Sequence, residues 1–340
     1  MSEIKIGVIG GSGLGDALGT EGTRHAVDTP FGSPSDAIVE SDWSGLPVFT
    51  LLRHGPGHLL NPSQVPYRAN IFALKKLGVT HIIASGAVGS LRDEFKPRDL
   101  VIPDQIIDRT SKRAGTFYDQ AAVHVEFAEP FCPVMRRILL EEGSGEGSGF
   151  RVQGSGNANA DARGPGSVIQ QSQPLNPEPR TLNPPPNPFA IHDRGCYVCM
   201  EGPAFSTRAE SLMHRLWGGD LIGMTAMPEA KLAREAQISY ALVALVTDYD
   251  CWRKPPAKNA EAPPADSAEL LKEIIANLRA ASDNGMALIR RVIERIARDP
   301  GAAANCPAHE ALKLAIWSDK TRIPREQVEL LSPLWMEYFG

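Results

Sequence analysis

The sequence predicts an α/β fold with a largely internal β-sheet. Apolar runs rich in β-branched residues alternate along the chain with stretches of helical periodicity, as strands alternate with helices in this class. Several of these runs end in glycine or polar residues, which is typical of strands leaving a sheet. With 340 residues, 42% of them apolar, the chain is long enough for one large domain or two ordinary ones.

The first predicted strand, residues 4–9, runs directly into the turn Gly10-Gly11-Ser12-Gly13. This turn has neither the glycine spacing of a dinucleotide-binding loop nor the lysine of a phosphate-binding Walker loop. Its backbone N–H groups and the hydroxyl of Ser12 suit a small anion, and an ordinary strand-to-helix turn is an equal alternative.

A second predicted strand, residues 48–52, ends in Arg53 and His54. An arginine at a strand end can hold an oxyanion through two parallel bonds, although a plain surface arginine is the commoner case.

The next predicted elements are a helix at 67–77, a strand at 80–84 and a strand at 99–103. The residues that follow the middle strand, 85–90, are small and predict another turn, which contains Gly86 and Ala87.

The segment 143–193 differs in composition, because Gly, Pro, Ser and Asn dominate it. Apolar residues are too sparse there to offset the entropy lost on ordering, so a disordered insertion is predicted. A linker between two domains is the alternative. Its flanks, a predicted helix at 133–142 and a strand at 196–200, continue one α/β unit and favour a single domain over residues 1–340.

A helix at 228–236 and a buried strand at 240–246 follow, and then a Pro-rich loop at 254–264. A long amphipathic helix comes next, with a predicted break at 283–285.

The buried strand ends in the sequence VTDYDCW, which places Tyr249 between Asp248 and Asp250. Side chains alternate along a strand, so the two carboxylates point the same way. Their desolvation is costly unless a ligand binds there, and ligands of open α/β sheets bind at this end of the strands. Two solvated aspartates at a strand exit are the alternative.

Composition limits the classes of partner. The net charge of -5 and the pI near 5.9 argue against nucleic acid or an anionic membrane, and no apolar run approaches the ~20 residues that span a bilayer. The five cysteines are scattered and odd in number, which favours reduced thiols. With no charged leader before an apolar core, we expect a cytoplasmic protein whose substrate is small.

An ordered series of motifs now bears on the family: GVIGGSGL, TPFGSPSD, RHG, GAVGSL, DQIIDRT, AEPFC, EGPAFSTRAE, GMTAMPEA and TDYDCW. Together they resemble the 5′-methylthioadenosine phosphorylases of the trimeric purine nucleoside phosphorylase superfamily. The resemblance is dense over residues 4–142 and 195–253 and looser over the C-terminal helices.

The resemblance implies a central mixed β-sheet surrounded by helices in three layers. It also implies reversible phosphorolysis of an adenine nucleoside in a homotrimer, with inorganic phosphate as co-substrate and neither metal nor organic cofactor. The phosphate-binding residues it implies are Ser12, Arg53, His54, Gly86, Ala87 and Thr225. Many relatives carry a hydroxyl residue at the position of Gly86, so one phosphate donor is expected to be absent.

Asp248 is the implied general acid at N7 of the leaving base, and Asp250 reads the 6-amino group. A carboxylate accepts a hydrogen bond from an amino group and repels a carbonyl, so the pair favours adenine over 6-oxopurines. The other implied substrate-binding residues are Phe205, Ser206, Ile222, Met224, Tyr249, Ser267 and Leu271, together with His124, which is implied to reach the site of a neighbouring subunit.

Two other interpretations stay open. One is a purine nucleoside phosphorylase of broader specificity, which two acids rather than an acid and an amide disfavour. The other is a nucleoside-binding protein without activity, which has no need of the phosphate-binding set.

Overall fold

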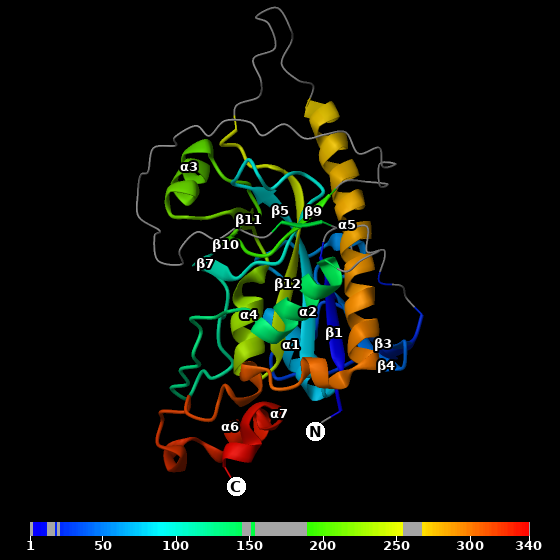
Figure 1. Ribbon diagram of the computed structural model, residues 1–340. Helices are drawn as coiled ribbons and strands as arrows, with labels where there is room; N and C mark the ends of the chain where they lie inside the picture. The colour runs from blue at the N-terminus through cyan, green and yellow to red at the C-terminus, as the bar shows by residue number, and fades with distance from the viewer. Residues whose placement is uncertain are drawn as a thin grey trace, which may run out of the picture.

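The computed structural model describes residues 3–11, 18, 21–144, 151–153, 189–253 and 267–339. In this part of the chain, the strands form one mixed 12-stranded sheet with helices on both sides (Figure 1). The mixed central sheet predicted from the sequence is therefore confirmed. The strands are β1 Ile6–Gly10, β2 Thr23–His25, β3 Ile38–Trp43, β4 Leu46–Leu52, β5 His81–Ser90, β6 Leu100–Val101, β7 Gln105–Arg109, β8 Arg151–Gln153, β9 Ala190–His192, β10 Cys196–Met200, β11 Leu221–Gly223 and β12 Ser239–Tyr249.

The main path of the sheet is β2-β3-β4-β1-β5-β12-β6-β9-β8, and β7, β10 and β11 extend it beside β5. Strands β4, β1, β5 and β12 are consecutive neighbours and run parallel. Their carboxyl ends therefore meet at one edge, where ligands of open α/β sheets bind.

Helices cover both faces of this sheet. They are α1 Tyr67–Lys76, α2 Pro133–Ser144, α3 Arg208–Leu216, α4 Ala226–Glu235, α5 Ser267–Arg298, α6 Arg325–Leu330 and α7 Ser332–Trp335, with 3-10 turns η2 Pro56–His58, η3 Pro300–Ala303, η4 Pro307–Glu310, η5 Lys320–Arg322 and η6 Met336–Tyr338. Alternate residues of β12 enter two different cores, which is the arrangement of a three-layer fold. Leu242 and Ala244 pack with α1 and α4, whereas Val243 and Leu245 pack with α2 and α5.

Two predicted boundaries are wrong because strand and helix continue through residues that favour a break. The predicted turn at 85–90 is the second half of β5, whose small residues pair with β12 from Ser85 to Ser90. The predicted helix break at 283–285 is absent, and α5 is continuous because Leu288, Val292 and Ile296 extend its buried face.

The predicted insertion at 143–193 is wrong at both of its ends. Residues 143 and 144 complete α2, while β8 and β9 pair in parallel and β9 also pairs with β6. Asp99 fixes β9, since its carboxylate accepts the N–H of Ala190 and lies 2.8 Å from Nε2 of His192. The middle of the predicted insertion, and the predicted loop at 254–264, lie outside the described residues.

No helix in the described ranges combines the length and the apolar character that crossing a membrane requires.

Glu235, the last residue of α4, is a buried carboxyl whose charge depends on pH. Its Oε2 accepts the N–H of Phe117 at 2.8 Å. Burial raises the pKa of Glu235 to about 7. The folded chain thus retains a proton that the unfolded chain releases near pH 4.5, so stability falls as the pH rises from about 4.5 to about 7.

We expect Glu235→Gln to be more stable than the wild type at pH 8, by about 3 kcal/mol, because glutamine keeps an acceptor oxygen and carries no charge. At pH 4 the two proteins should be equally stable. Urea unfolding at both pH values measures this, with Glu310→Gln at an exposed glutamate as the control. A stability difference that does not change with pH would contradict the shifted pKa.

Candidate active site

Four of the predicted phosphate-binding residues, Arg53, His54, Gly86 and Ala87, lie where β4 ends or in the second half of β5, toward the carboxyl edge of the sheet. Arg53 follows β4, and its N–H donates to the carbonyl of Gly10 at the end of β1. Gly11 lies so close to these groups that a Cβ there would be 2.6 Å from Nη1 of Arg53. Only glycine therefore allows the first turn to lie against the arginine. Ser12 lies outside the described residues.

Arg53 is fully buried and forms an ion pair that the sequence analysis did not foresee. Its Nε and Nη2 donate to the two carboxylate oxygens of Glu229, at 2.8 and 2.7 Å, and Nη1 donates to the carbonyl of Ser85 at 2.7 Å. The Nε/Nη2 edge of the guanidinium is thus occupied by Glu229, and a two-bond clamp of Arg53 on an oxyanion stays a prediction for the other edge. A guanidinium has five N–H groups, so Nη1 and Nη2 each keep one further donor.

His54 is neutral at physiological pH. Burial lowers the pKa of its imidazole to about 4, and the neighbouring charge of Arg53 acts in the same direction. Its Nδ1 lies 2.7 Å from the carbonyl oxygen of Leu60, so Nδ1 carries the proton and donates it. The ring stacks on His58 with centroids 4.1 Å apart. His54 therefore offers Nε2 as an acceptor, which suits a protonated phosphate oxygen.

Beside Arg53, the middle of β5 has a neighbouring strand on one side only, among the described residues. Pairing with β1 ends at Ala84 and pairing with β11 begins at Gly89, so between them only β12 pairs with β5 in the described chain. Gly86 and Ala87 lie in this stretch, which leaves backbone polar groups for a ligand. The Oγ1 of Thr225 faces it, 3.4 Å from where a Cβ on Gly86 would stand.

Asp248 and Asp250 lie at the end of β12, next to this open stretch. Burial raises the pKa of Asp248, the hydroxyl of Thr247 lowers it through a 2.5 Å hydrogen bond, and the charge of Asp250 raises it. Among the described residues, none is a hydrogen-bond partner of the buried Oδ2 of Asp250. A buried carboxylate oxygen without a hydrogen-bond partner can accept a hydrogen bond from a donor on a bound ligand.

Tyr249 does not join these carboxylates. It points to the other side of β12, where its hydroxyl donates to the carbonyl of Asp93 at 3.2 Å and Arg253 lies 4.0 Å over its ring. The alternation of a strand places it there. The structure therefore does not bring Tyr249 to the predicted base site.

Two of the predicted substrate-binding residues, Ile222 and Ser206, lie next to Asp250 and the residue that follows it. Ile222 and Asp250 both flank Gly89, at 3.1 and 3.4 Å from where its Cβ would lie. Ser206 lies close to the end of β12, because the thiol of the exposed Cys251 donates to the carbonyl of Ser206 at 3.3 Å. Met224 immediately precedes Thr225. Phe205 lies in the same segment as Ser206, but it is 87% exposed in the isolated chain.

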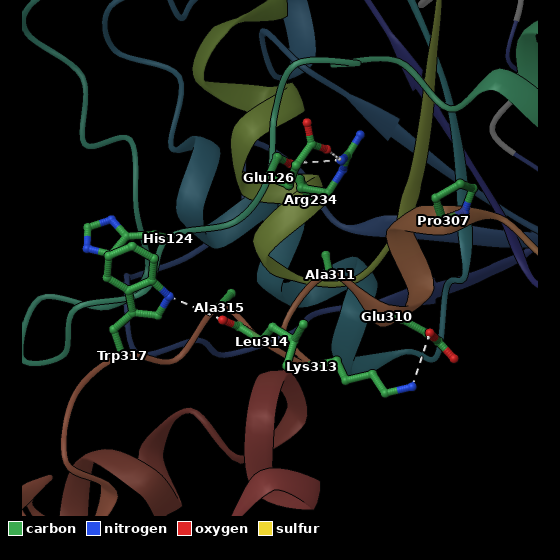
Figure 2. A pocket seen from close by; sticks show the side chains of 10 residues that line it. All are labelled: His124, Glu126, Arg234, Pro307, Glu310, Ala311, Lys313, Leu314, Ala315 and Trp317. Atoms are coloured by element: carbon green, nitrogen blue, oxygen red, sulfur yellow. Dashed lines mark hydrogen bonds and ion pairs between the residues drawn. The ribbon is translucent and has the colours of Figure 1, made fainter.

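His124 lies elsewhere, in a groove of about 410 Å³ shown in Figure 2. Its ring packs edge-on against Trp317 with centroids 4.7 Å apart, and its N–H donates to the carbonyl of Ala315. Trp317 and Leu314 are 72% and 86% exposed. Within the single chain, His124 lies in this groove and away from the aspartates, and its role at a neighbouring subunit stays a prediction.

Of the two predicted substrate-binding residues near the start of α5, Ser267 and Leu271, the structure describes the side chain of Leu271 alone. Leu271 is 57% exposed, and the side chain of Ser267 is not among those described. Asn277, six residues after Leu271, donates to the carbonyl of Thr247 at 3.1 Å. At about 1.5 Å per helical residue, Leu271 lies roughly 9 Å farther along α5 than this contact.

Sequence reasoning missed a second buried arginine that shapes the site. Arg113 donates through Nη1 to the carbonyls of Met224 and Met227, both at 2.6 Å, and through Nη2 to the carbonyl of Glu201. These bonds fix the turn that presents Thr225. A lone arginine after β7 carries no sequence signal for this role, whereas Glu229 stands inside the quoted motif GMTAMPEA and could have been found.

Glu201 completes this support. Burial raises the pKa of its carboxyl, but hydrogen bonds from Ser63, Ser111 and Lys112 and the charge of Arg113 lower it further, to about 2. The carboxylate is therefore ionised at any physiological pH and holds the arginine in place.

The chain is similar to known proteins over most of its length. The family model described as the phosphorylase superfamily matches residues 5–294. An S-methyl-5′-thioadenosine phosphorylase of Thermosynechococcus vestitus is 41% identical, covering 98% of this chain and 99% of the relative. One from Chloroflexus aurantiacus is 40% identical, with 100% of both chains covered.

Solved structures similar to this chain point to the same family. A methylthioadenosine phosphorylase from an antarctic soil metagenomic library has a TM-score of 0.73 at 38% identity, over 98% of this chain and 99% of the other. The Schistosoma mansoni methylthioadenosine phosphorylase in complex with adenine has a TM-score of 0.74 at 32% identity, over 93% and 99%. The chain therefore belongs to the phosphorylase superfamily, within the family of S-methyl-5′-thioadenosine phosphorylases.

Proposed function

We propose that this chain catalyses the reversible phosphorolysis of S-methyl-5′-thioadenosine to adenine and 5-methylthioribose 1-phosphate. The observation that carries the proposal is the meeting, at one sheet edge, of an anion-binding stretch and a carboxyl with a raised pKa. Phosphate is the co-substrate, and the proposed reaction needs no metal or organic cofactor.

Phosphate binds against the open side of β5. Thr225 and the backbone of Gly86 and Ala87 donate to its oxygens, as do Ser12 and the remaining N–H groups of Arg53. His54 accepts from a protonated oxygen through Nε2. Fixed in this way, the anion both attacks the ribose and stabilises the positive charge that develops on the sugar as the glycosidic bond breaks.

The leaving adenine takes up negative charge, which a proton at N7 neutralises. Asp248 supplies this proton, because burial raises its pKa and so keeps more of the carboxyl protonated. Asp250 accepts from the 6-amino group through its buried Oδ2. Ile222, Met224, Ser206 and Phe205 surround base and sugar.

We also propose a homotrimer, in which His124 and the exposed apolar surface around Trp317 face a neighbouring subunit and its site. Leu271, which is exposed in the isolated chain, and Ser267 line the 5′ pocket in the assembled enzyme. Cys132, Cys199, Cys251 and Cys306 are free thiols, which suits the reducing cytoplasm as the proposed compartment.

Adenine release should require inorganic phosphate. Thr225→Val should raise the KM for phosphate by about tenfold or more, since one hydrogen bond to a charged group contributes about 1.5–3 kcal/mol, and should leave the KM for nucleoside nearly unchanged. Initial rates over a phosphate series measure this. Thr50→Val is the control, because Thr50 is a buried threonine whose hydroxyl donates to the carbonyl of Val39 instead. Equal release in phosphate-free buffer would identify a hydrolase.

Methylthioadenosine should be the better substrate by about ten- to a hundredfold in kcat/KM over adenosine, the size of preference that one apolar contact gives. Parallel kinetics with methylthioadenosine, adenosine and inosine decide this. Adenosine at equal efficiency would indicate the broader phosphorylase, and binding of all three without turnover would indicate a nucleoside-binding protein.

A further inference from the structure

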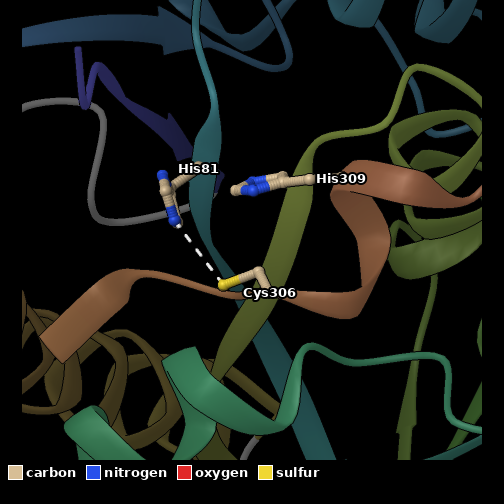
Figure 3. A group of neighbouring side chains, drawn as sticks. All are labelled: His81, Cys306 and His309. Carbon is tan, nitrogen blue, oxygen red and sulfur yellow. Dashed lines mark hydrogen bonds between the residues drawn. The ribbon is translucent and has the colours of Figure 1, made fainter. Parts of the chain in front are cut away.

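A second group of reactive side chains lies at the opposite end of β5 from the candidate active site. His81 begins β5, whereas Cys306 and His309 belong to the segment that follows α5 (Figure 3). One ligand atom from each of the three lies within 4.8 Å of the other two. His81 and Cys306 are 2% and 3% exposed, and His309 is half-buried. Eight strand residues separate His81 from Gly89, beside Asp250, which is about 25 Å.

One separation in this group matches the first coordination sphere of zinc. Sγ of Cys306 lies 3.6 Å from Nε2 of His81. In a tetrahedral site with Zn–S near 2.3 Å and Zn–N near 2.0–2.1 Å, sulfur and nitrogen stand about 3.6 Å apart. The other ring nitrogen of His81 is 2.8 Å from the hydroxyl of Thr80, and such a partner orients a metal-binding imidazole.

We propose that Cys306, His81 and His309 bind one structural zinc ion. Thiolate and imidazole ligands select zinc among the common divalent cations. The three ligands lie about 25 Å from Asp250 along β5, so the ion would tie β5 to the segment after α5 rather than take part in catalysis.

The same side chains also form a hydrogen-bonded network, which is the competing explanation. Nε2 of His309 lies 3.2 Å from Oγ of Ser239 and 3.1 Å from the carbonyl of Thr80, and Nε2 of His81 lies 3.1 Å from the carbonyl of Ala303. The two explanations differ at Ser239, whose hydroxyl belongs to the network but is not one of the three ligands.

Zinc uptake by the tag-free, full-length protein tests the proposal. After treatment with a chelator and dialysis against zinc, the wild type should retain one zinc per chain by mass spectrometry of the metal. The Tm of the protein should rise by roughly 5–10 °C when the free zinc concentration is a hundredfold above the Kd for zinc. The cobalt-loaded protein should show thiolate charge-transfer absorption and the strong visible bands of tetrahedral cobalt.

Cys306→Ser and His309→Gln should lose both the bound zinc and its effect on the Tm, and the half-buried His309 gives a variant that disturbs the core least. Cys251→Ser, at an exposed cysteine, and Ser239→Ala, which keeps all three ligands, should retain both the zinc and its effect on the Tm. A wild type that takes up no zinc, or a Cys306→Ser variant that keeps it, would overturn the proposal. Phosphorolysis rates of zinc-free and zinc-loaded protein should be equal below the lower Tm.

Discussion

Glu229→Gln is expected to lower the free energy of unfolding by about 3–5 kcal/mol, one of the largest effects open to a single substitution in this chain. The side chains of Arg53 and Glu229 are 0% and 1% exposed, so water cannot solvate the cation that the variant leaves behind. Glutamine keeps the shape and one acceptor oxygen but removes the charge. Tyr240, whose hydroxyl donates to Oε1 of Glu229 at 2.8 Å, loses a charged partner as well.

Urea unfolding at neutral pH measures this effect. The matched control is Glu329→Gln, because Arg325 and Glu329 form an ion pair of the same 2.7 Å length with side chains that are 91% and 56% exposed. That variant should change stability by less than about 1 kcal/mol. Equal effects at both positions would mean that burial does not govern the Arg53 pair.

Asp248→Asn is expected to lower phosphorolysis of adenine nucleosides by roughly 10² or more, because asparagine has no proton to give to the leaving base. An amide can instead donate to a 6-oxo group, so inosine should gain relative to adenosine. In the wild type, activity should fall as the pH rises through the raised pKa of Asp248, and this loss should be absent from the residual activity of the variant.

Steady-state rates on both nucleosides over a range of pH provide the test. Asp93→Asn is the control, because the side chain of Asp93 is 67% exposed and its change should alter neither the rates nor their pH dependence. Unchanged rates in the Asp248 variant would place this residue outside the reaction.

The sequence predicts the sheet edge well because strand ends have local signals. β-Branched runs that end in Arg53 and in Asp248 required no tertiary information, and both residues lie at the carboxyl edge as predicted. The partner of Arg53 could not be predicted in this way, since Glu229 is 176 residues away in sequence. Such a pairing depends on how α4 packs on β12, which no local pattern encodes.

Local sequence patterns also mispredict where some strands and helices begin and end. The small residues 85–90 favour a turn by propensity, yet they remain a strand because β12 offers partners along the whole stretch. Polar residues after 143 predicted no structure, yet Asp99 and β6 fix a strand at 190–192. In each case a tertiary contact overrides the composition of the segment.

Cys251 is positioned so that a probe attached to its thiol would lie next to the candidate active site. Of the five cysteines, all of them in the described ranges, Cys251 is exposed and the other four are buried. It directly follows Asp250, and its thiol touches the backbone of Ser206. Burial and the charge of Asp250 raise the pKa of Cys251, so alkylation is slow at neutral pH and faster in mild alkali. A fluorophore introduced by this route would stand at the mouth of the base site without any engineered cysteine.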